Sequence, residues 1–172
     1  MSAAPGVVVW FTGLPSSGKS TLAERVAEAL RARGVATCVL DGDAVRATVV
    51  PPWGYDPTGR DHFYDTLAGL AAMLAGQGLA VLVPATANKR AYRERARGRA
   101  GRFVEVHVRA SEATVRERDA KGLYAAQAAG VVADVPGADA GYEAPERADV
   151  VADGGMDAEA VERVVEQVIG VS

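Results

Sequence analysis

The sequence predicts one α/β domain over residues 1–172, with a mostly parallel sheet flanked by helices. Short apolar and β-branched runs alternate with amphipathic stretches along the chain, which is the pattern of repeated strand–helix units. The first of these runs is apolar at almost every position, as in a strand that is covered on both faces. No internal repeat and no linker-like segment divides the chain.

The predicted strands are compact runs rich in valine, leucine and aromatic residues. They cover residues 7–12, 37–40, 79–83, 103–108 and 150–151. In sheets of this class, catalytic residues gather at the carboxyl ends of the strands, so we expect the functional residues to follow these runs.

The predicted helices have apolar residues three or four positions apart. They cover residues 19–33, 63–75, 90–99, a stretch that opens at residue 111, and 161–168. Gly34 ends the first helix and Gly76 the second. Prolines at 51, 52 and 57 indicate a loop before the second helix. Residues 119–145 show no sustained period and are interpreted as a lid.

The composition excludes several classes of partner. The formal net charge is -3, so the chain offers no basic field for nucleic acid or for an anionic membrane. The apolar run at 7–11 is too short to span a bilayer. Cys38 is the only cysteine, which excludes an internal disulfide and fits a reducing compartment. We therefore expect a cytoplasmic protein that holds anionic ligands in a local site.

Residues 13–20, GLPSSGKS, match the phosphate-loop pattern G-x-x-x-x-G-K-S/T between a predicted strand and a predicted helix. Its glycines let the backbone curl so that amides point at phosphate oxygens, and the following helix adds its positive end. Lys19 supplies a charge for the β- and γ-phosphates, and the Ser20 hydroxyl can ligate Mg²⁺. The predicted ATP-binding residues are Gly13, Leu14, Pro15, Ser16, Ser17, Gly18, Lys19, Ser20 and Thr21.

Asp41 and Asp43 follow the second predicted strand. On an extended backbone alternate side chains point the same way, so we expect both carboxylates to face the phosphate loop. One can hold Mg²⁺ while the other accepts the proton of an attacking hydroxyl. We assign the metal to Asp41, with Ser20, and the base to Asp43, and the reverse assignment stays open. With Lys19, these two residues are the predicted catalytic groups; the alternative is a turn with two solvated acids.

With these residues assembled, the chain resembles the adenylylsulfate (APS) kinases, which phosphorylate the 3′-hydroxyl of adenosine 5′-phosphosulfate. The resemblance extends from about residue 8 to residue 151 and rests on several segments. They are WFTGL at 10–14, LDGDAVR at 40–46, GY at 54–55, Arg60, and RDAKGLY at 118–124, which is similar to the family's lid motif. The resemblance implies a single-domain P-loop kinase fold with a lid at about 119–145. It also implies that the enzyme uses ATP and Mg²⁺ and acts on a small-molecule nucleotide acceptor.

The resemblance also implies roles for individual residues. Arg118 and Lys121 on the lid are expected to contact ATP. The expected acceptor-binding residues are Arg46, Tyr55, Arg60, Arg90, Lys121, Gly122 and Leu123. Tyr55 stands where the family places a phenylalanine against the acceptor's adenine, and Trp53 and Phe63 are candidates for a second wall. Family members are commonly dimers, which implies a homodimer.

The acceptor side departs from the family pattern. Phe63 and Asp65 replace an asparagine and an arginine, and Ala87 replaces a serine. An anion at position 65 close to a phosphosulfate would oppose its binding by about 1 kcal/mol or more if partly buried. Lys89 adds a positive charge in the same region.

These departures leave several functions open. The chain is an APS kinase, a related kinase with another nucleotide or metabolite acceptor, or a nucleotide-binding regulator without transfer activity. The retention of Lys19, Ser20, Asp41 and Asp43 together favours a kinase. A triphosphate hydrolase is the least favoured alternative, because no segment that would position water is evident.

Overall fold

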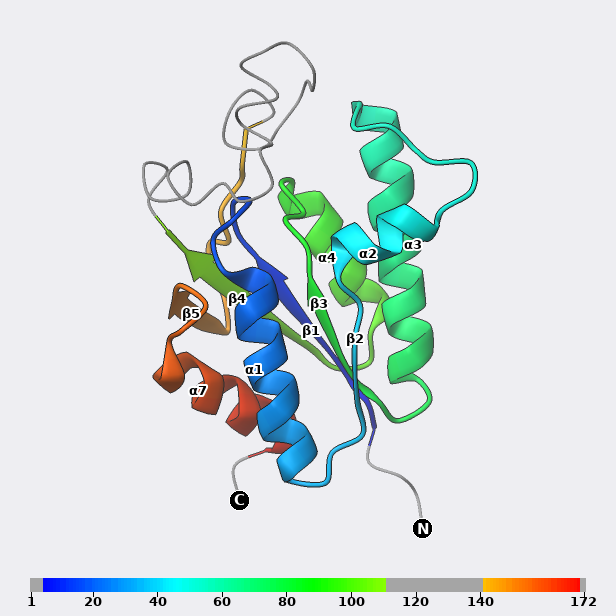
Figure 1. Cartoon of the computed structure of the whole chain (residues 1–172). Coiled ribbons are helices and arrows are strands. Elements are labelled where there is room, and N and C mark those ends of the chain that lie inside the picture. Colours follow the sequence, from blue (N-terminus) through cyan, green and yellow to red (C-terminus); the bar gives the residue numbers. More distant parts are fainter. Residues whose placement is uncertain (1–4, 111–140, 171–172) are drawn as a thin grey trace.

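The computed structural model describes residues 5–110 and 141–170 (Figure 1). In this part of the chain, five parallel strands form one sheet in the order β2-β3-β1-β4-β5. They are β1 (Val7–Thr12), β2 (Thr37–Val39), β3 (Ala80–Pro84), β4 (Phe103–Arg109) and β5 (Val150–Asp153). The predicted α/β class with a parallel sheet is confirmed.

Helices cover both faces of this sheet (Figure 1). They are α1 (Lys19–Ala32), α2 (Gly42–Thr48), α3 (Pro57–Ala75), α4 (Arg90–Arg99) and α7 (Ala158–Ile169). Helices α1 and α7 pack on one face, and α3 and α4 pack on the other. Among the helices of the described ranges, none combines the length and the apolar character that crossing a membrane requires.

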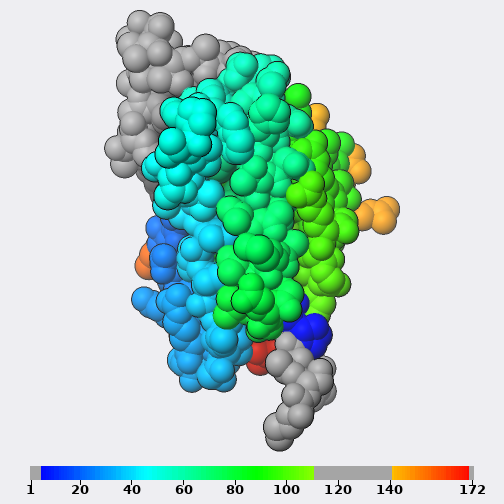
Figure 2. Space-filling model, turned by 90° about the vertical axis from the view of Figure 1, so that its right-hand side faces the viewer, coloured from blue at the N-terminus to red at the C-terminus, as the bar shows by residue number. Residues whose placement is uncertain are grey.

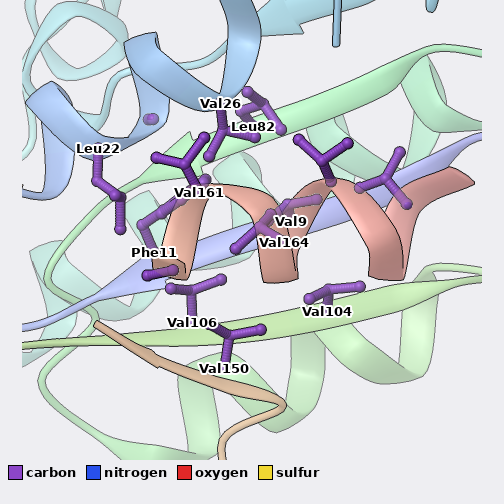
Figure 3. Close-up of a cluster of buried hydrophobic side chains, with 14 of the residues drawn as sticks. Val9, Phe11, Leu22, Val26, Leu82, Val104, Val106, Val150, Val161 and Val164 are labelled. Atoms are coloured by element: carbon purple, nitrogen blue, oxygen red, sulfur yellow. The ribbon is translucent and has the colours of Figure 1, made fainter. Parts of the chain in front are cut away.

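The central strand β1 contributes to two separate cores. Val7, Val9 and Phe11 pack with residues of α1 and α7 in one apolar cluster. Figure 3 shows Val9 and Phe11 within this cluster. Val8 and Trp10 pack with α3 and α4 in the other. Successive side chains of a strand point to opposite faces, so β1 is buried on both sides. The loop that follows β1 therefore starts from a rigid base.

The second strand is shorter than predicted, and a helix follows it. Strand β2 ends at Val39 and α2 begins at Gly42, where the sequence predicted extended backbone. The Asp41 carboxylate starts this helix, because its Oδ1 accepts hydrogen bonds from the N–H groups of Asp43 (3.0 Å) and Ala44 (3.2 Å). The prediction of extended backbone is therefore wrong, since an N-cap aspartate turns the chain into a helix at this point.

Helix α3 begins at Pro57, whereas the sequence predicted that Pro57 belongs to the preceding loop. Asp56 caps the helix by accepting a hydrogen bond from the Gly59 N–H at 3.2 Å. Proline suits the first turn of a helix, because its missing N–H would have no partner there. The first turns of α3 consequently stand on the side of the sheet where the strands end (Figure 1). The other described elements lie close to their predicted ranges.

Helices α3 and α4 lie side by side on one face of the molecule (Figure 2) and are joined by ion pairs. Arg95 contacts Asp61 at 2.8 Å and Asp65 at 3.4 Å, and Arg99 also pairs with Asp65. The hydrogen bond from Arg95 lowers the pKa of the Asp61 carboxyl. Two arginines therefore balance the Asp65 carboxylate, so these contacts give no support to the expected repulsion of an anionic acceptor.

Residues 111–140 lie outside the described residues. The helix predicted to open at 111, most of the predicted lid, and the lid residues Arg118, Lys121, Gly122 and Leu123 fall in this range. The last residues of the predicted lid are described, and Tyr142 hydrogen-bonds Thr12 at the carboxyl end of β1.

Candidate active site

The phosphate loop, residues 13–20, joins β1 to α1 at the carboxyl edge of the sheet (Figure 1). Close contacts require glycine at two of its positions. A Cβ on Gly13 would lie 2.4 Å from the Val108 carbonyl oxygen. Gly18 has a φ of 101°, and a Cβ on it would lie 2.4 Å from the Gly155 nitrogen. The shape of the loop therefore depends on backbone contacts with β4 and with the segment after β5.

Polar groups of the loop converge on its own backbone. Lys19 Nζ donates a hydrogen bond to the Leu14 carbonyl oxygen at 2.8 Å, and the Ser17 N–H donates to the same oxygen at 3.1 Å. The Ser17 hydroxyl is fully buried and has no hydrogen-bond partner in the described part of the chain. Buried hydroxyls are nearly always hydrogen-bonded, so this orphaned atom indicates that the loop accommodates a polar ligand.

The two predicted Mg²⁺ ligands are in contact. Ser20 Oγ donates to Asp41 Oδ2 at 2.7 Å, while Asp41 Oδ1 caps α2. A hydroxyl and a carboxylate oxygen are hard ligands, and they fit Mg²⁺. In the described ranges, no group of three or more His, Cys, Asp or Glu could hold a metal alone. A magnesium ion here would therefore take its other ligands from phosphate and water.

The two aspartates have different environments. Asp41 is half-buried and uses both oxygens, whereas Asp43 is exposed in the first turn of α2. Gly42 between them is buried, and a Cβ on it would lie 3.0 Å from the Ala85 Cβ. The start of α2 is thus held between the phosphate loop and the segment after β3.

Arg46 forms the middle layer of a stack on the predicted acceptor side. Its guanidinium carbon lies 4.3 Å from the Tyr55 ring centroid and 4.1 Å from the Phe63 ring centroid. It also donates to the carbonyl oxygens of Trp53 and Gly54, at 3.3 Å each. The Tyr55 ring, on one face of the Arg46 guanidinium, is exposed, whereas the Phe63 ring, on the other face, is buried. Phe63 therefore supports Arg46 from below and does not form an open wall.

The other two predicted acceptor cations differ from each other. Arg60 is 6% exposed, and its guanidinium has no hydrogen bond or ion pair within the described residues. A buried cation is costly unless it is paired, and no carboxylate of the described residues pairs with Arg60, which fits its predicted role in binding an anionic acceptor. Arg90 is exposed and pairs with Glu146 at 3.5 Å, while its N–H donates to the Glu143 carboxylate at 2.8 Å. Of the two, only Arg60 is buried without a protein carboxylate beside it in the described residues.

A hydroxyl cluster at the base of the phosphate loop was not predicted. Thr12 Oγ1 donates to the Thr86 carbonyl oxygen at 2.6 Å and lies 2.9 Å from the Tyr142 hydroxyl. His107, next to Thr12 in the sheet, has its pKa lowered by burial and then by Arg109. It is neutral at pH 7. The signal in the sequence was a single threonine that closes an otherwise apolar strand.

The family comparison decides the assignment. Residues 5–153 match the family model described as adenylylsulphate kinase. The chain belongs to the adenylylsulphate kinase family. The matched range contains all five strands of the described sheet, together with the phosphate loop and the predicted acceptor residues up to Arg90.

Individual members of the family agree with this assignment. The chain is 42% identical to the adenylyl-sulfate kinase of Klebsiella pneumoniae subsp. pneumoniae over 151 residues, 87% of this chain and 75% of that protein. It is also 42% identical to the adenylyl-sulfate kinase of a Synechococcus species over 146 residues, 85% of this chain and 83% of that protein. Its fold matches the Mycobacterium tuberculosis APS kinase, solved in complex with AMPPNP and APS, with a TM-score of 0.88. That pair is 34% identical over 96% of this chain and 99% of the other.

Membership in the adenylylsulphate kinase family confirms the predicted enzyme class, an ATP-dependent phosphotransferase with a hydroxyl acceptor. The roles of individual residues stay predictions. The structure brings Ser20, Asp41 and the phosphate loop together, and it stacks Arg46 on Tyr55. The predicted lid contacts of residues 118–123 lie outside the described residues.

Proposed function

We propose that this member of the adenylylsulphate kinase family transfers the γ-phosphate of ATP to the 3′-hydroxyl of adenosine 5′-phosphosulfate. The observation that carries the proposal is the Ser20–Asp41 contact at 2.7 Å. It places the end of the phosphate loop against the start of α2. The same short helix also bears Asp43 and Arg46, so it connects the donor phosphates with the acceptor.

The donor side positions the triphosphate. The backbone amides of residues 13–20 and the positive end of α1 surround the β-phosphate, and Lys19 follows the γ-phosphate. Ser20 and Asp41 would hold Mg²⁺, which when bound neutralises charge on the phosphate oxygens. The buried Ser17 hydroxyl gains a phosphate oxygen as its hydrogen-bond partner.

Helix α2 aligns the acceptor hydroxyl with its base. Asp43 and Arg46 are three residues apart, so both side chains project from the same side of the helix. In this arrangement Arg46 binds the acceptor while the Asp43 carboxylate accepts the proton of the attacking hydroxyl. Asp41 is assigned to the metal instead, because its Oδ2 accepts a hydrogen bond from Ser20, the other proposed Mg²⁺ ligand.

The acceptor side supplies positive charge and one aromatic face. Arg60 is buried without a carboxylate partner in the described residues, which suits the negative phosphosulfate. The Tyr55 ring is 46% exposed and already packs on a flat guanidinium, so its outer face can stack on the adenine.

The test is ADP release by the purified chain with Mg-ATP, in the presence and in the absence of adenosine 5′-phosphosulfate. We expect turnover that depends on this acceptor and a product with a new phosphate at the 3′ position. Equal turnover without acceptor would show a hydrolase. Binding of ADP and Mg²⁺ without any turnover would show a regulator. Turnover only with another hydroxyl compound would keep the kinase and replace the acceptor.

Three further predictions concern the protein as a whole. We propose Mg²⁺ as the divalent ion, a homodimer as the assembly and the cytoplasm as the location. Sedimentation of the purified chain tests the homodimer, and loss of ADP release after chelation of divalent ions, with recovery on adding Mg²⁺, tests the metal. Fractionation of cells that express the chain tests the location.

A further inference from the structure

The segment that follows β3 contains a strained residue. Ala87 has a φ of 44°, in the left-handed region that residues with a side chain rarely adopt. Such a conformation persists only where its surroundings hold it in place. The contacts of residues 85–88, called here the Ala87 turn, show what holds it.

One side of the Ala87 turn is attached to β1. The Ala85 N–H donates to the Phe11 carbonyl oxygen at 3.1 Å, and the Trp10 indole N–H donates to the Ala85 carbonyl oxygen at 3.2 Å. The Thr12 hydroxyl donates to the next carbonyl oxygen along the turn. These contacts fix the entry to the turn on the strand that carries the phosphate loop.

The strained residue itself is held by two buried side chains. The Ala87 N–H donates to the Tyr64 hydroxyl at 2.9 Å, and the Arg93 guanidinium donates to the Ala87 carbonyl oxygen. Tyr64 comes from α3 and Arg93 from α4, and both are buried. Arg93 is in turn held by the Glu105 carboxylate of β4 at 3.1 Å. The two peptide groups on either side of Ala87 are therefore hydrogen-bonded by side chains of α3 and α4.

The end of the Ala87 turn is hydrogen-bonded to the segment that starts at residue 141. The Glu143 N–H donates to the Asn88 carbonyl oxygen at 2.8 Å, and the Arg93 guanidinium reaches the Glu143 carbonyl oxygen. One arginine thus holds carbonyl groups from two distant parts of the chain. The Ala87 turn cannot shift without breaking several of these hydrogen bonds.

The turn lies directly beside the proposed chemistry. A Cβ on Gly42 would lie 3.0 Å from the Ala85 Cβ and 3.3 Å from the Pro84 carbonyl oxygen. Gly42 separates Asp41 from Asp43 at the start of α2. The position of the Ala87 turn therefore limits where the start of α2 can stand.

We propose that Tyr64 is a positioning residue for the acceptor, acting together with Arg93 through the strained Ala87 turn. This inference rests on the proposed function, because the acceptor is the one named there. The Tyr64 hydroxyl holds the Ala87 N–H, the turn supports the start of α2, and α2 presents Asp43 and Arg46 to the acceptor. The donor phosphates are bound elsewhere, by the phosphate loop.

The packing of the Tyr64 ring allows its hydroxyl to be tested alone. The ring stacks on Tyr92 with centroids 4.6 Å apart and meets the Phe63 edge at 5.1 Å. A phenylalanine can make both ring contacts, so Tyr64→Phe removes the hydroxyl and little else. Tyr92→Phe is the matched control, because it removes a hydroxyl from the same stack and leaves the Ala87 hydrogen bonds unchanged.

The experiment measures KM for each substrate and hydrogen exchange of the Ala87 amide. In Tyr64→Phe we expect KM for adenosine 5′-phosphosulfate to rise about fivefold, the loss of one hydrogen bond, while KM for ATP changes less than about twofold. The Ala87 amide should exchange faster, and Tyr92→Phe should show neither change. If the Ala87 amide of Tyr64→Phe exchanged at the same rate as in the parent, the positioning role would be overturned. Equal increases in the KM values for both substrates would also overturn it.

A double-mutant cycle with Ala87→Gly separates support of the strained turn from packing. Glycine takes a positive φ without strain, so the hydroxyl has less to hold. We expect Tyr64→Phe to change the acceptor KM by less than about twofold in the Ala87→Gly background. The same fivefold change in both backgrounds would show that Tyr64 acts through packing, and would overturn the proposal.

The parent chain separates the two proposals. A parent without turnover on adenosine 5′-phosphosulfate would overturn the proposed function and, with it, this inference. An active parent whose Tyr64→Phe variant keeps the parental KM would overturn the positioning role alone.

Discussion

The two sides of the site are built from different materials. The donor edge, residues 13–20 with Gly155, is shaped by backbone contacts that exclude side chains at Gly13 and Gly18. The acceptor edge, made of Arg46, Tyr55, Arg60 and Phe63, is shaped by side chains stacked on one another. A backbone site tolerates little change, whereas a stack of side chains can be rebuilt one residue at a time. Of the departures from the family pattern, Phe63 lies in this stack, and the phosphate loop shows none.

The largest expected effect tests the donor edge. Lys19→Ala removes the positive charge that follows the γ-phosphate, so we expect kcat to fall about 100-fold or more with any acceptor. ADP release measures it, with thermal unfolding as the check on folding. Lys19→Arg is the matched variant, because it keeps the charge and changes its shape. If the alanine variant kept more than about a tenth of the parental kcat, the donor edge would not depend on this side chain.

A smaller effect is expected at the acceptor edge. Arg46→Ala removes the middle layer of the stack and its charge, so KM for adenosine 5′-phosphosulfate should rise about tenfold. KM for ATP should stay within about twofold of the parent. Arg46→Lys keeps the charge but cannot stack between two rings. Its KM for adenosine 5′-phosphosulfate should therefore lie between those of the parent and Arg46→Ala. Equal increases in both KM values would contradict a separation of the two edges.

The next effect concerns stability beside the donor edge and depends on pH. Asp157 accepts hydrogen bonds from the Asp153 N–H at 2.9 Å and, as the cap of α7, from the Ala160 N–H at 3.0 Å. These bonds lower the pKa of the Asp157 carboxyl below its ordinary 3.8. Because the folded pKa is lowered, the stabilisation is present above about pH 4 and is lost as the pH falls through the folded value. Asp157→Ala should lower the free energy of unfolding by about 1 kcal/mol at pH 7.

Urea unfolding of parent and variant at neutral pH and near pH 3 measures this difference. The difference in the free energy of unfolding between the parent and Asp157→Ala should become smaller as the Asp157 carboxyl of the parent becomes protonated. Asp157→Asn is the matched control, because the amide oxygen can still cap α7 and does not titrate. A difference that stays constant over this range would contradict the assignment of the lowered pKa to these hydrogen bonds.

The smallest expected effect tests whether the α3–α4 ion pairs influence the acceptor edge. Asp65→Asn breaks the ion pairs with Arg95 and Arg99, which are partly exposed, so stability should fall by about 0.5 kcal/mol. KM for adenosine 5′-phosphosulfate should not change, because the Asp65 charge is already balanced. A lower KM in this variant would show that the carboxylate does repel the acceptor.

The donor edge could be predicted from the sequence because its signals are local. Strand β1 and the phosphate loop are adjacent in the chain, and each glycine of the motif is required by the backbone. The start of α2 was mispredicted for a local reason as well. An aspartate after a short strand is compatible both with an extended backbone and with a helix cap, and Asp41 forms the cap.

The supports of the acceptor edge could not be predicted from the sequence. Helix α4 contains several arginines, and nothing in its sequence distinguishes the fully buried Arg93 from the partly exposed Arg95. The strain at Ala87 and its contact with Tyr64 join residues 23 positions apart, and they exist only once α3 has packed against the sheet. Asp65 was expected to oppose binding of the acceptor, because its arginine partners on α4 cannot be recognised in the sequence.

The close approach of Gly18 to Gly155 has a consequence for shortened versions of the chain. Residue 155 lies just past the range that matches the family model, which ends at residue 153. A fragment cut at that boundary would keep all residues of the phosphate loop but would lose the backbone of residues 154 and 155, which packs against Gly18. Its affinity for ADP should therefore fall although its motif is intact. A fragment that extends past residue 155 keeps this contact and should retain the affinity.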